Sequence, residues 1–169
     1  YLIVYFNWFQ KSRFIESNFY DIIFSGWGAS ACILLNEMDK QNLLSSKKVL
    51  IIDPSEKLEN DKTFCFWSTK EEDIFKDYRL LISNQWSGIQ INNSQPESIS
   101  PQFYFHINSI DLYDKARSII EKYTIKVLVG KITRIQNGAK VKVKSSEGSF
   151  TCSYVFDSRS IDFEKIKKS

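Results

Sequence analysis

The sequence predicts an α/β fold in which a parallel sheet is joined to an antiparallel β-meander. An apolar run at 20–24, a glycine turn, an apolar helical segment and a β-branched run at 49–52 follow one another in the order of a βαβ unit. Further β-like runs follow late in the chain, two of them separated by Asn137-Gly138, a dipeptide typical of hairpin turns. The composition is globular, with 43% hydrophobic and 25% charged residues.

Composition and charge exclude several classes of protein. The residue content rules out collagen-like, low-complexity and disordered chains. The 23 Lys and Arg exceed the 20 Asp and Glu by three, and the charges are mixed along the chain, so no basic stripe indicates a nucleic acid partner. The longest apolar stretch, Tyr1–Phe9, is interrupted by Asn7 and is shorter than the roughly 20 residues of a membrane-spanning helix.

The cysteines give no sign of a disulfide framework or a metal site. The three residues are widely spaced and include no C-x-x-C pair. We therefore expect no bound metal and a reducing, cytoplasmic location.

The first three elements form the predicted βαβ unit. The apolar residues 20–24, ended by Ser25-Gly26, indicate a buried parallel strand. A helix is expected from Ala29 through Met38, followed by a strand at 49–52 that ends before Asp53-Pro54. A right-handed crossover makes the two strands parallel.

The rest of the chain is less regular at first. Residues 55–101 are expected to be mostly loop and short strands. Asn108 or Ser109 can cap a helix that runs to about Tyr123. Later strands are expected at 126–129, 132–136, 140–144 and 150–156, the last three forming the meander.

The turn after the first strand carries the pattern G-x-G-x-x-A, formed by Gly26, Gly28 and Ala31. The first glycine permits a tight turn, the second lets the backbone approach a pyrophosphate, and the small Ala31 lets helix and strand pack closely. Asp53, 27 positions after Gly26, can accept hydrogen bonds from an adenosine ribose. A carboxylate there disfavours a 2′-phosphate, so the pattern predicts FAD or NAD rather than NADP. The alternative is that the glycines only turn the chain and Asp53 only ends a strand.

Trp27 lies between the two glycines, where space is usually limited. We expect its ring to point outward, or the loop to depart from the usual one. A bulky residue here also suits a dinucleotide-binding or interaction module without catalysis.

An aromatic cluster at Asp61–Trp67 predicts either an apolar pocket or ordinary core packing beneath a loop. Cys65 lacks a base at a recognisable spacing, because the single histidine, His106, is remote in sequence. Asp157 and Arg159 follow an apolar strand, at the carboxyl end where open α/β sheets bind ligands.

These motifs, in this order, resemble the flavoprotein family of lycopene β-cyclases, which has a Rossmann-type FAD-binding fold. The most specific part is Asp-Lys-Thr-Phe-Cys-Phe-Trp at 61–67, which is similar to the family's Asp-Arg-Thr-Trp-Cys-Phe-Trp element. The other parts lie at 20–28, 50–53, 103–108 and 155–159, so the resemblance spans roughly 20–160.

The resemblance implies a domain organisation for the chain. Residues 20–160 would form the FAD-binding portion, with part of the substrate-side region at about 61–107. Residues 1–19 would be an N-terminal extension of unclear role, and 161–169 the start of a missing C-terminal part. The chain begins at Tyr1 and its single Met is Met38, so we expect a truncated, N-terminal fragment that is inactive alone.

The resemblance also implies a reaction and a set of site residues. Such enzymes close the linear ψ-ends of lycopene into β-ionone rings by proton-initiated isomerisation, with reduced FAD and with NAD(P)H as electron donor. Gly26, Gly28, Ala31 and Asp53 would bind the cofactor, and the flavin-side or substrate-side candidates are Asp61, Thr63, Trp67, Asp157 and Arg159. The catalytic acid is unknown and expected downstream of Ser169. The apolar carotenoid substrate implies contact with the inner face of a membrane without spanning it.

One other enzyme class shares this cofactor fold. A flavin-dependent monooxygenase or related oxidoreductase is the alternative, because a fold does not determine its chemistry.

Overall fold

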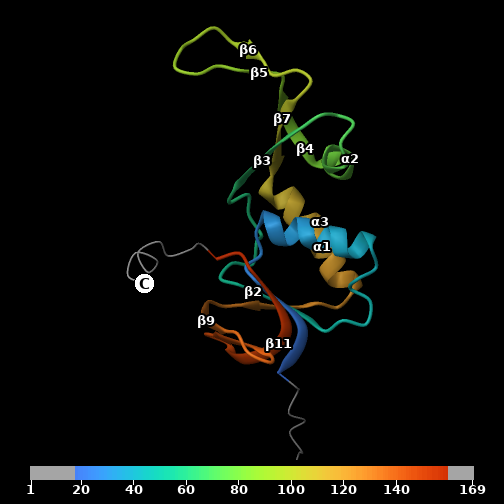
Figure 1. The fold of residues 1–169 in the computed structure, drawn as a ribbon, viewed down its shortest axis with the longest axis vertical. Coiled ribbons are helices and arrows are strands. Elements are labelled where there is room, and N and C mark those ends of the chain that lie inside the picture. The colour runs from blue at the N-terminus through green and yellow to red at the C-terminus, as the bar shows by residue number, and fades with distance from the viewer. Residues whose placement is uncertain (1–17, 160–169) are drawn as a thin grey trace, which may run out of the picture.

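The computed structural model describes residues 18–159. The main sheet and its helices are built from β1 (Phe19–Ser25), α1 (Ala29–Lys40), β2 (Val49–Asp53), α3 (Ser109–Lys122), β8 (Lys126–Val129), β9 (Ile132–Gln136), β10 (Val141–Ser145) and β11 (Gly148–Asp157). This sheet has the order β8-β2-β1-β11-β10-β9 (Figure 1). Strands β8, β2, β1 and β11 are parallel, whereas β11, β10 and β9 form an antiparallel meander.

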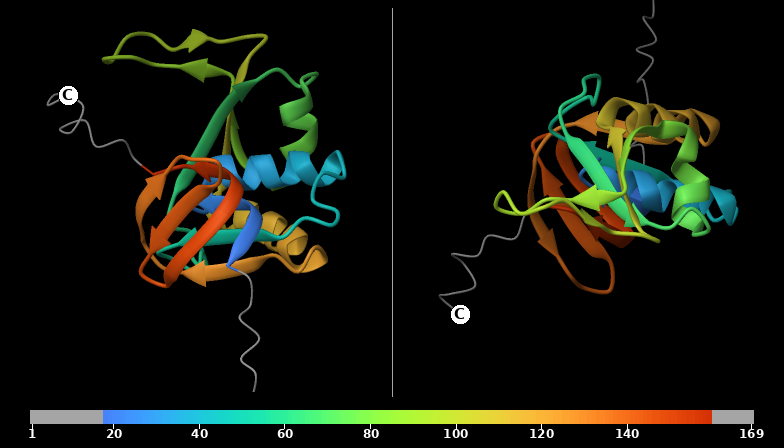
Figure 2. Two further views of the ribbon diagram at one scale, coloured as in Figure 1. Left: turned by 60° about the horizontal axis from the view of Figure 1, so that its bottom comes forward. Right: turned by 90° about the horizontal axis from the view of Figure 1, so that it is seen from above.

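Both faces of the central parallel strands β1 and β2 are buried, which explains their continuous apolar sequences. Ile22 and Ile51 pack with α1 and α3 in one apolar core. Ile23 and Leu50, which point the other way, pack with meander residues such as Val143 in a second core. The parallel sheet is therefore a layer between two helices and a curled meander (Figure 2).

A second, smaller sheet stands beyond the helices. It is formed by β3 (Thr63–Ser68), β4 (Ile82–Trp86) and β7 (Phe103–Asn108) in the antiparallel order β3-β7-β4. The short helix α2 (Asp73–Tyr78) and the 3₁₀ turn η1 (Arg79–Leu81) connect β3 to β4. A projecting hairpin of β5 (Gly88–Ile89) and β6 (Glu97–Ser98) extends from this sheet at the far end of the molecule (Figure 1).

The predicted fold class is confirmed, and the βαβ unit, the long helix and the three meander strands lie within two residues of their predicted bounds. The segment 55–101 is more regular than predicted, because it contains α2 and two strands of the second sheet. Of the predicted terminal segments, 1–19 lies outside the described residues except for Asn18 and Phe19, and 161–169 lies outside them entirely. Between residues 18 and 159, no helix has both the length and the apolar character needed to cross a membrane.

The expectation that the Trp27 ring points outward is wrong. The residue is 2% exposed, and its ring packs edge-on against Tyr113, with the Arg117 guanidinium 5.3 Å from the ring centroid. The ring thus fills space beneath α3, where it contributes to the core and leaves the front of the glycine turn open.

Candidate functional site

A cleft of about 910 Å³ opens at the carboxyl ends of β1, β2, β8 and β11. Strand β1 lies between β2 and β11 in the sheet. The chain connects β1 to β2 through α1 on one side, whereas β11 follows the meander on the other side. This edge is therefore a topological switch point, the place where open α/β sheets bind ligands. Five of the residues predicted for the site line the cleft, namely Gly26, Gly28, Asp53, Asp157 and Arg159.

The structure gives a different reason for a glycine at each of the two positions in the turn. Gly26 has a φ of +109°, and a Cβ on it would collide with the Ser158 hydroxyl oxygen. Gly28 is extended, with a φ of −103°, and a Cβ on it would meet no heavy atom within 4 Å. Gly26 is therefore required by the turn itself, whereas Gly28 leaves open space directly in front of α1.

The N-terminus of α1 is available to an anion. Gly28 is its N-cap, no side chain caps it, and its first turn contains no acidic residue. The first intrahelical bond is donated by the Cys32 N–H to the Gly28 carbonyl oxygen, 3.0 Å away. The N–H groups before Cys32 and the positive end of the helix dipole are the features that favour a phosphate.

Asp53 holds the glycine turn in place. Its Oδ2 accepts a hydrogen bond of 2.7 Å from the Trp27 backbone N–H, and its Oδ1 accepts one of 2.8 Å from the Ser55 N–H. Each carboxylate oxygen can accept more than one hydrogen bond. Asp53 is 6% exposed and lines the cleft, so it can both fix the turn and receive a ribose hydroxyl.

Lys57 also lines the cleft, although no sequence motif includes it. Its Nζ lies 3.5 Å from Asp53 Oδ1 and 3.6 Å from Asp61 Oδ2, and its side chain is 10% exposed. The only sequence signal was its position four residues after one aspartate and four before the other. The ammonium group balances the negative charge of Asp53 at the cleft wall.

Asp157 and Arg159 form a two-bond ion pair across the end of β11. Arg159 Nε and Nη2 donate to the two carboxylate oxygens, each at 2.8 Å. These hydrogen bonds hold the pKa of the Asp157 carboxyl below its ordinary value. The neighbouring Ser158 hydroxyl donates to the Ser25 carbonyl oxygen at 2.8 Å and so closes the rear of the turn.

The remaining predicted residues do not line this cleft. Ala31 is buried behind it, where its small side chain lets α1 pack near Phe24. Thr63 lines a separate apolar pocket of about 200 Å³ between α1, α2 and β3. Trp67 is 52% exposed on the outer face of the second sheet, where its ring lies 4.7 Å from that of Tyr104.

Asp61 connects the cleft wall to the helix behind it. Its Oδ1 accepts a hydrogen bond of 3.0 Å from the Tyr113 hydroxyl. Burial alone would raise the pKa of Asp61, but the hydrogen bond from Tyr113 and the charge of Lys57 together lower it. Burial, followed by the hydrogen bond to Asp61 and the negative charge of Asp61, raises the pKa of Tyr113.

The three cysteines and the histidine form no nucleophilic or metal-binding group. Cys32 is buried, which raises the pKa of its thiol to about 12, and Cys152 is also buried with a raised pKa. His106 accepts or donates at Nδ1 to the Ser83 hydroxyl, 2.6 Å away. In the described part of the chain, no three His, Cys, Asp or Glu side chains gather as metal ligands would.

The fold and the cleft define a Rossmann-type α/β protein with an appended β-meander. No protein-family model and no curated protein matches the sequence. Solved structures do match. The anhydrotetracycline hydroxylase OxyS from Streptomyces rimosus is 15% identical, with a TM-score of 0.56 over 81% of this chain and 31% of its own.

Two other structures show the same similarity. A mutant of PqsL from P. aeruginosa is 11% identical, with a TM-score of 0.57 over 81% of this chain and 42% of its own. A mutant of the halogenase PltM in complex with FAD is 15% identical, with a TM-score of 0.54 over 88% of this chain and 36% of its own. The chain thus has the fold of one part of these proteins and spans less than half of their length.

Proposed function

We propose that this chain is the FAD-binding part of a flavin-dependent enzyme. The observation that carries the proposal is the open space in front of Gly28, between the uncapped N-terminus of α1 and Asp53. A helix N-terminus favours a pyrophosphate, and a carboxylate at the end of the second strand favours a ribose. The matching fold of PltM, whose structure holds FAD, supports this cofactor over NAD.

The chain's own residues fit the group. The turn from Gly26 to Gly28 and the first turn of α1 would receive the diphosphate, and Asp53 the adenosine ribose. Lys57 and Arg159 add positive charge to the same cleft wall. Bound FAD supplies electron transfer or, when reduced, a negative charge that can stabilise a cation.

We further propose that the reaction is the cyclisation of lycopene ends to β-ionone rings. The proposal comes from the similarity of residues 61–67 to the cyclase element. Residues 63–67 of this element lie in β3, and the aromatic side chains around β3 support the proposal. Trp67 and Trp86 flank Tyr104 on the outer face of the second sheet, with ring centroids 4.7 and 5.9 Å from it. The exposed rings of Trp67 and Trp86, tilted against the ring of Tyr104, suit an apolar, conjugated substrate.

In this proposal the catalytic acid that protonates the substrate belongs to sequence beyond Ser169, and NAD(P)H keeps the flavin reduced. The described residues would bind the cofactor and one side of the polyene. Expression of the complete reading frame in a lycopene-accumulating bacterium tests the reaction. Cyclic carotenes of unchanged mass support it, whereas persistent lycopene beside soluble, flavin-loaded protein overturns it.

A flavin-dependent hydroxylase or related oxidoreductase is the second candidate. The fold shared with the hydroxylase OxyS favours it. Such an enzyme consumes oxygen and NAD(P)H when its substrate is present, whereas a cyclase consumes neither in its net reaction. Purified full-length protein that is folded but lacks flavin absorbance, and binds no added FAD, overturns both candidates and favours a module without catalysis.

A further inference from the structure

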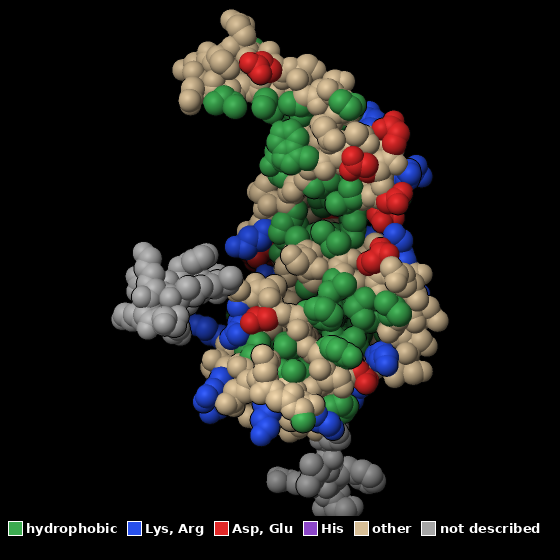
Figure 3. Space-filling model, in the orientation of Figure 1, with side chains coloured by type: hydrophobic (Ala, Val, Ile, Leu, Met, Phe, Trp, Pro, Cys, Tyr) green, Lys and Arg blue, Asp and Glu red, His purple; other side chains and the backbone are tan. Residues whose placement is uncertain are grey.

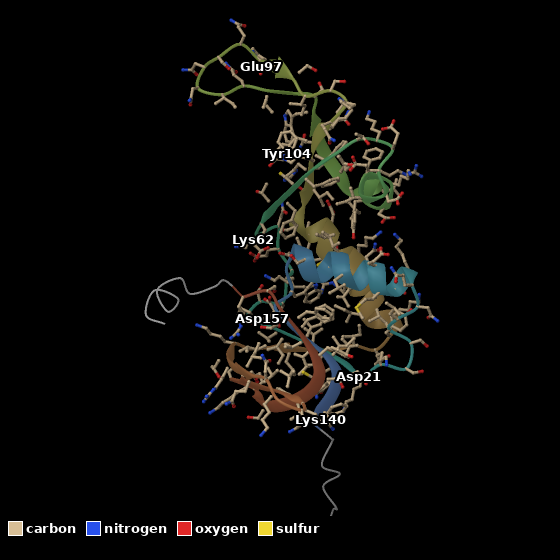
Figure 4. All side chains as sticks on the ribbon, viewed as in Figure 1. Asp21, Lys62, Glu97, Tyr104, Lys140 and Asp157 are labelled. Carbon is tan, nitrogen blue, oxygen red and sulfur yellow. The ribbon has the colours of Figure 1, made fainter. Side chains whose placement is uncertain are left out.

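The apolar pocket between α1, α2 and β3 is separate from the proposed cofactor cleft. It has a volume of about 200 Å³ and shares no lining residue with the cleft. Ala29, the first residue of α1, lines the pocket, whereas Gly28 lines the cleft. In Figure 4, Lys62 marks the start of β3 at the upper side of α1, and Asp157 marks the cleft at its lower side. The pocket and the cleft therefore adjoin the same end of α1 but are distinct cavities.

The walls of the pocket are neutral and mostly apolar. Among the described residues, no Lys, Arg, Asp or Glu lines it. Its walls include Ile33 of α1, Phe64 and Phe66 of β3, Ile74 of α2 and Leu112 of α3. Figure 3 shows hydrophobic side chains gathered on the visible face between α1 and the second sheet. Such a pocket, built on regular elements, favours a neutral and mainly apolar ligand.

One polar group in the wall lacks a partner. Tyr78 lines the pocket and is 4% exposed, and its buried hydroxyl oxygen has no hydrogen-bond partner among the described residues. Buried hydroxyl groups are nearly always hydrogen-bonded, because an unpaired one costs free energy. Burial raises the pKa of Tyr78 to about 12, so the hydroxyl keeps its proton and can donate a hydrogen bond to a ligand oxygen.

The volume of the pocket limits the size of its ligand. An apolar protein cavity of about 150 Å³ holds one benzene molecule. A pocket of about 200 Å³ therefore admits a single aromatic ring with a small substituent. The polyene of the proposed reaction is much longer than such a ring, so the pocket would serve a different molecule.

We propose that the pocket between α1, α2 and β3 is a binding site for a neutral, single-ring aromatic molecule that carries one hydroxyl or carbonyl oxygen. The ring would lie among the apolar walls, and its oxygen would accept a hydrogen bond from the Tyr78 hydroxyl. A ligand there would contact both α1 and β3, and so would join the helix layer to the second sheet. The proposal does not rest on flavin binding.

Titration of the full-length protein with phenol, followed by ligand-observed NMR, tests the proposal. We expect a dissociation constant on the order of 1 mM. Benzoate is expected not to bind, because the neutral pocket offers its charge no partner. Bound phenol is also expected to slow the alkylation of Cys65 by iodoacetamide, since Cys65 lines the pocket. Absence of phenol binding, or an unchanged rate at Cys65 with saturating phenol, would overturn the proposal.

Three variants locate the binding. Tyr78→Phe keeps the ring and removes the hydroxyl, so it is expected to bind phenol about three- to tenfold more weakly but to bind toluene as the natural sequence does. Ile33→Glu, at an exposed position in the pocket wall, introduces a charge and is expected to weaken phenol binding at least threefold. The matched control Ile91→Glu makes the same change at an exposed position outside the pocket. Equal loss in both glutamate variants, or unchanged phenol affinity in Tyr78→Phe, would contradict a site in this pocket.

Discussion

Separate substitution of the two turn glycines by alanine tests the cleft most sharply, because the structure gives them opposite consequences. Gly26→Ala forces a side chain into a φ of +109° and against the Ser158 hydroxyl. Gly28→Ala places a methyl group in open space at an ordinary extended φ of −103°. The first change is expected to damage the fold, and the second to damage ligand binding alone.

The magnitudes follow from these surroundings. For Gly26→Ala, backbone strain of about 1–3 kcal/mol adds to about 1 kcal/mol for the displaced hydrogen bond from Ser158 to the Ser25 carbonyl. The free energy of unfolding is thus expected to fall by about 2–4 kcal/mol. For Gly28→Ala, reduced freedom of the unfolded chain stabilises by about 0.4–1 kcal/mol, and a poorer N-cap offsets it by a similar amount.

Urea unfolding and FAD titration of the full-length protein measure the two effects. Gly26→Ala is expected to lower the urea midpoint without changing the slope. Gly28→Ala is expected to unfold like the natural sequence but to bind FAD at least tenfold more weakly, since its methyl group occupies the approach to α1. Gly138→Ala, in the exposed β9–β10 hairpin, serves as control and leaves FAD binding unchanged. Unaltered FAD affinity in Gly28→Ala would refute the assignment of the diphosphate to this turn.

Three further outcomes are expected. Asp53→Ala removes the acceptor of the Trp27 N–H and is expected to lower the free energy of unfolding, measured in urea, by about 1–3 kcal/mol. Asp53→Asn keeps a side-chain oxygen that can accept this hydrogen bond, so its free energy of unfolding is expected to fall by less. At pH values above the unfolded-state pKa of Asp61, Tyr113→Phe is expected to lower the free energy of unfolding by at most about 1 kcal/mol. That difference is expected to vanish as the pH of the unfolding assay falls through the lowered pKa of the folded state, and a pH-independent difference would contradict it. Iodoacetamide is expected to modify Cys65 in the native protein, with one adduct by mass spectrometry, because the other two thiols are buried; two or more adducts would contradict this.

The main sheet was predictable because its signals are local. The apolar runs of β1 and β2 are continuous since each is buried on both faces, and the glycine pattern falls between a strand and a helix. The second sheet was not predictable in the same way. Its strands β3 and β7 are separated by residues 69–102, which contain α2 and β4, and their pairing brings together residues more than 30 positions apart.

The parts of the site that escaped prediction depend on contacts between distant segments. The direction of the Trp27 ring is decided by Tyr113 and Arg117 on α3, which lie far away in the sequence. Likewise, the residues that line the apolar pocket belong to separate stretches of the sequence until α1, α2 and β3 pack around it. Sequence periodicity identifies elements, whereas such neighbours are set by how the elements pack.

Lys57 shows why the cofactor cleft and the second sheet act as one structural unit. Its ammonium group contacts Asp53, which holds the glycine turn, and Asp61, which lies just before β3. Asp61 is held in turn by Tyr113 of α3, the same ring that packs against Trp27 of the turn. These contacts therefore form a closed ring of interactions that joins the cleft to the second sheet. Loss of any member is expected to displace both Asp53, which we propose binds the ribose, and the strand that carries the aromatic surface. A substitution at Lys57 is therefore expected to affect cofactor affinity and the second sheet together.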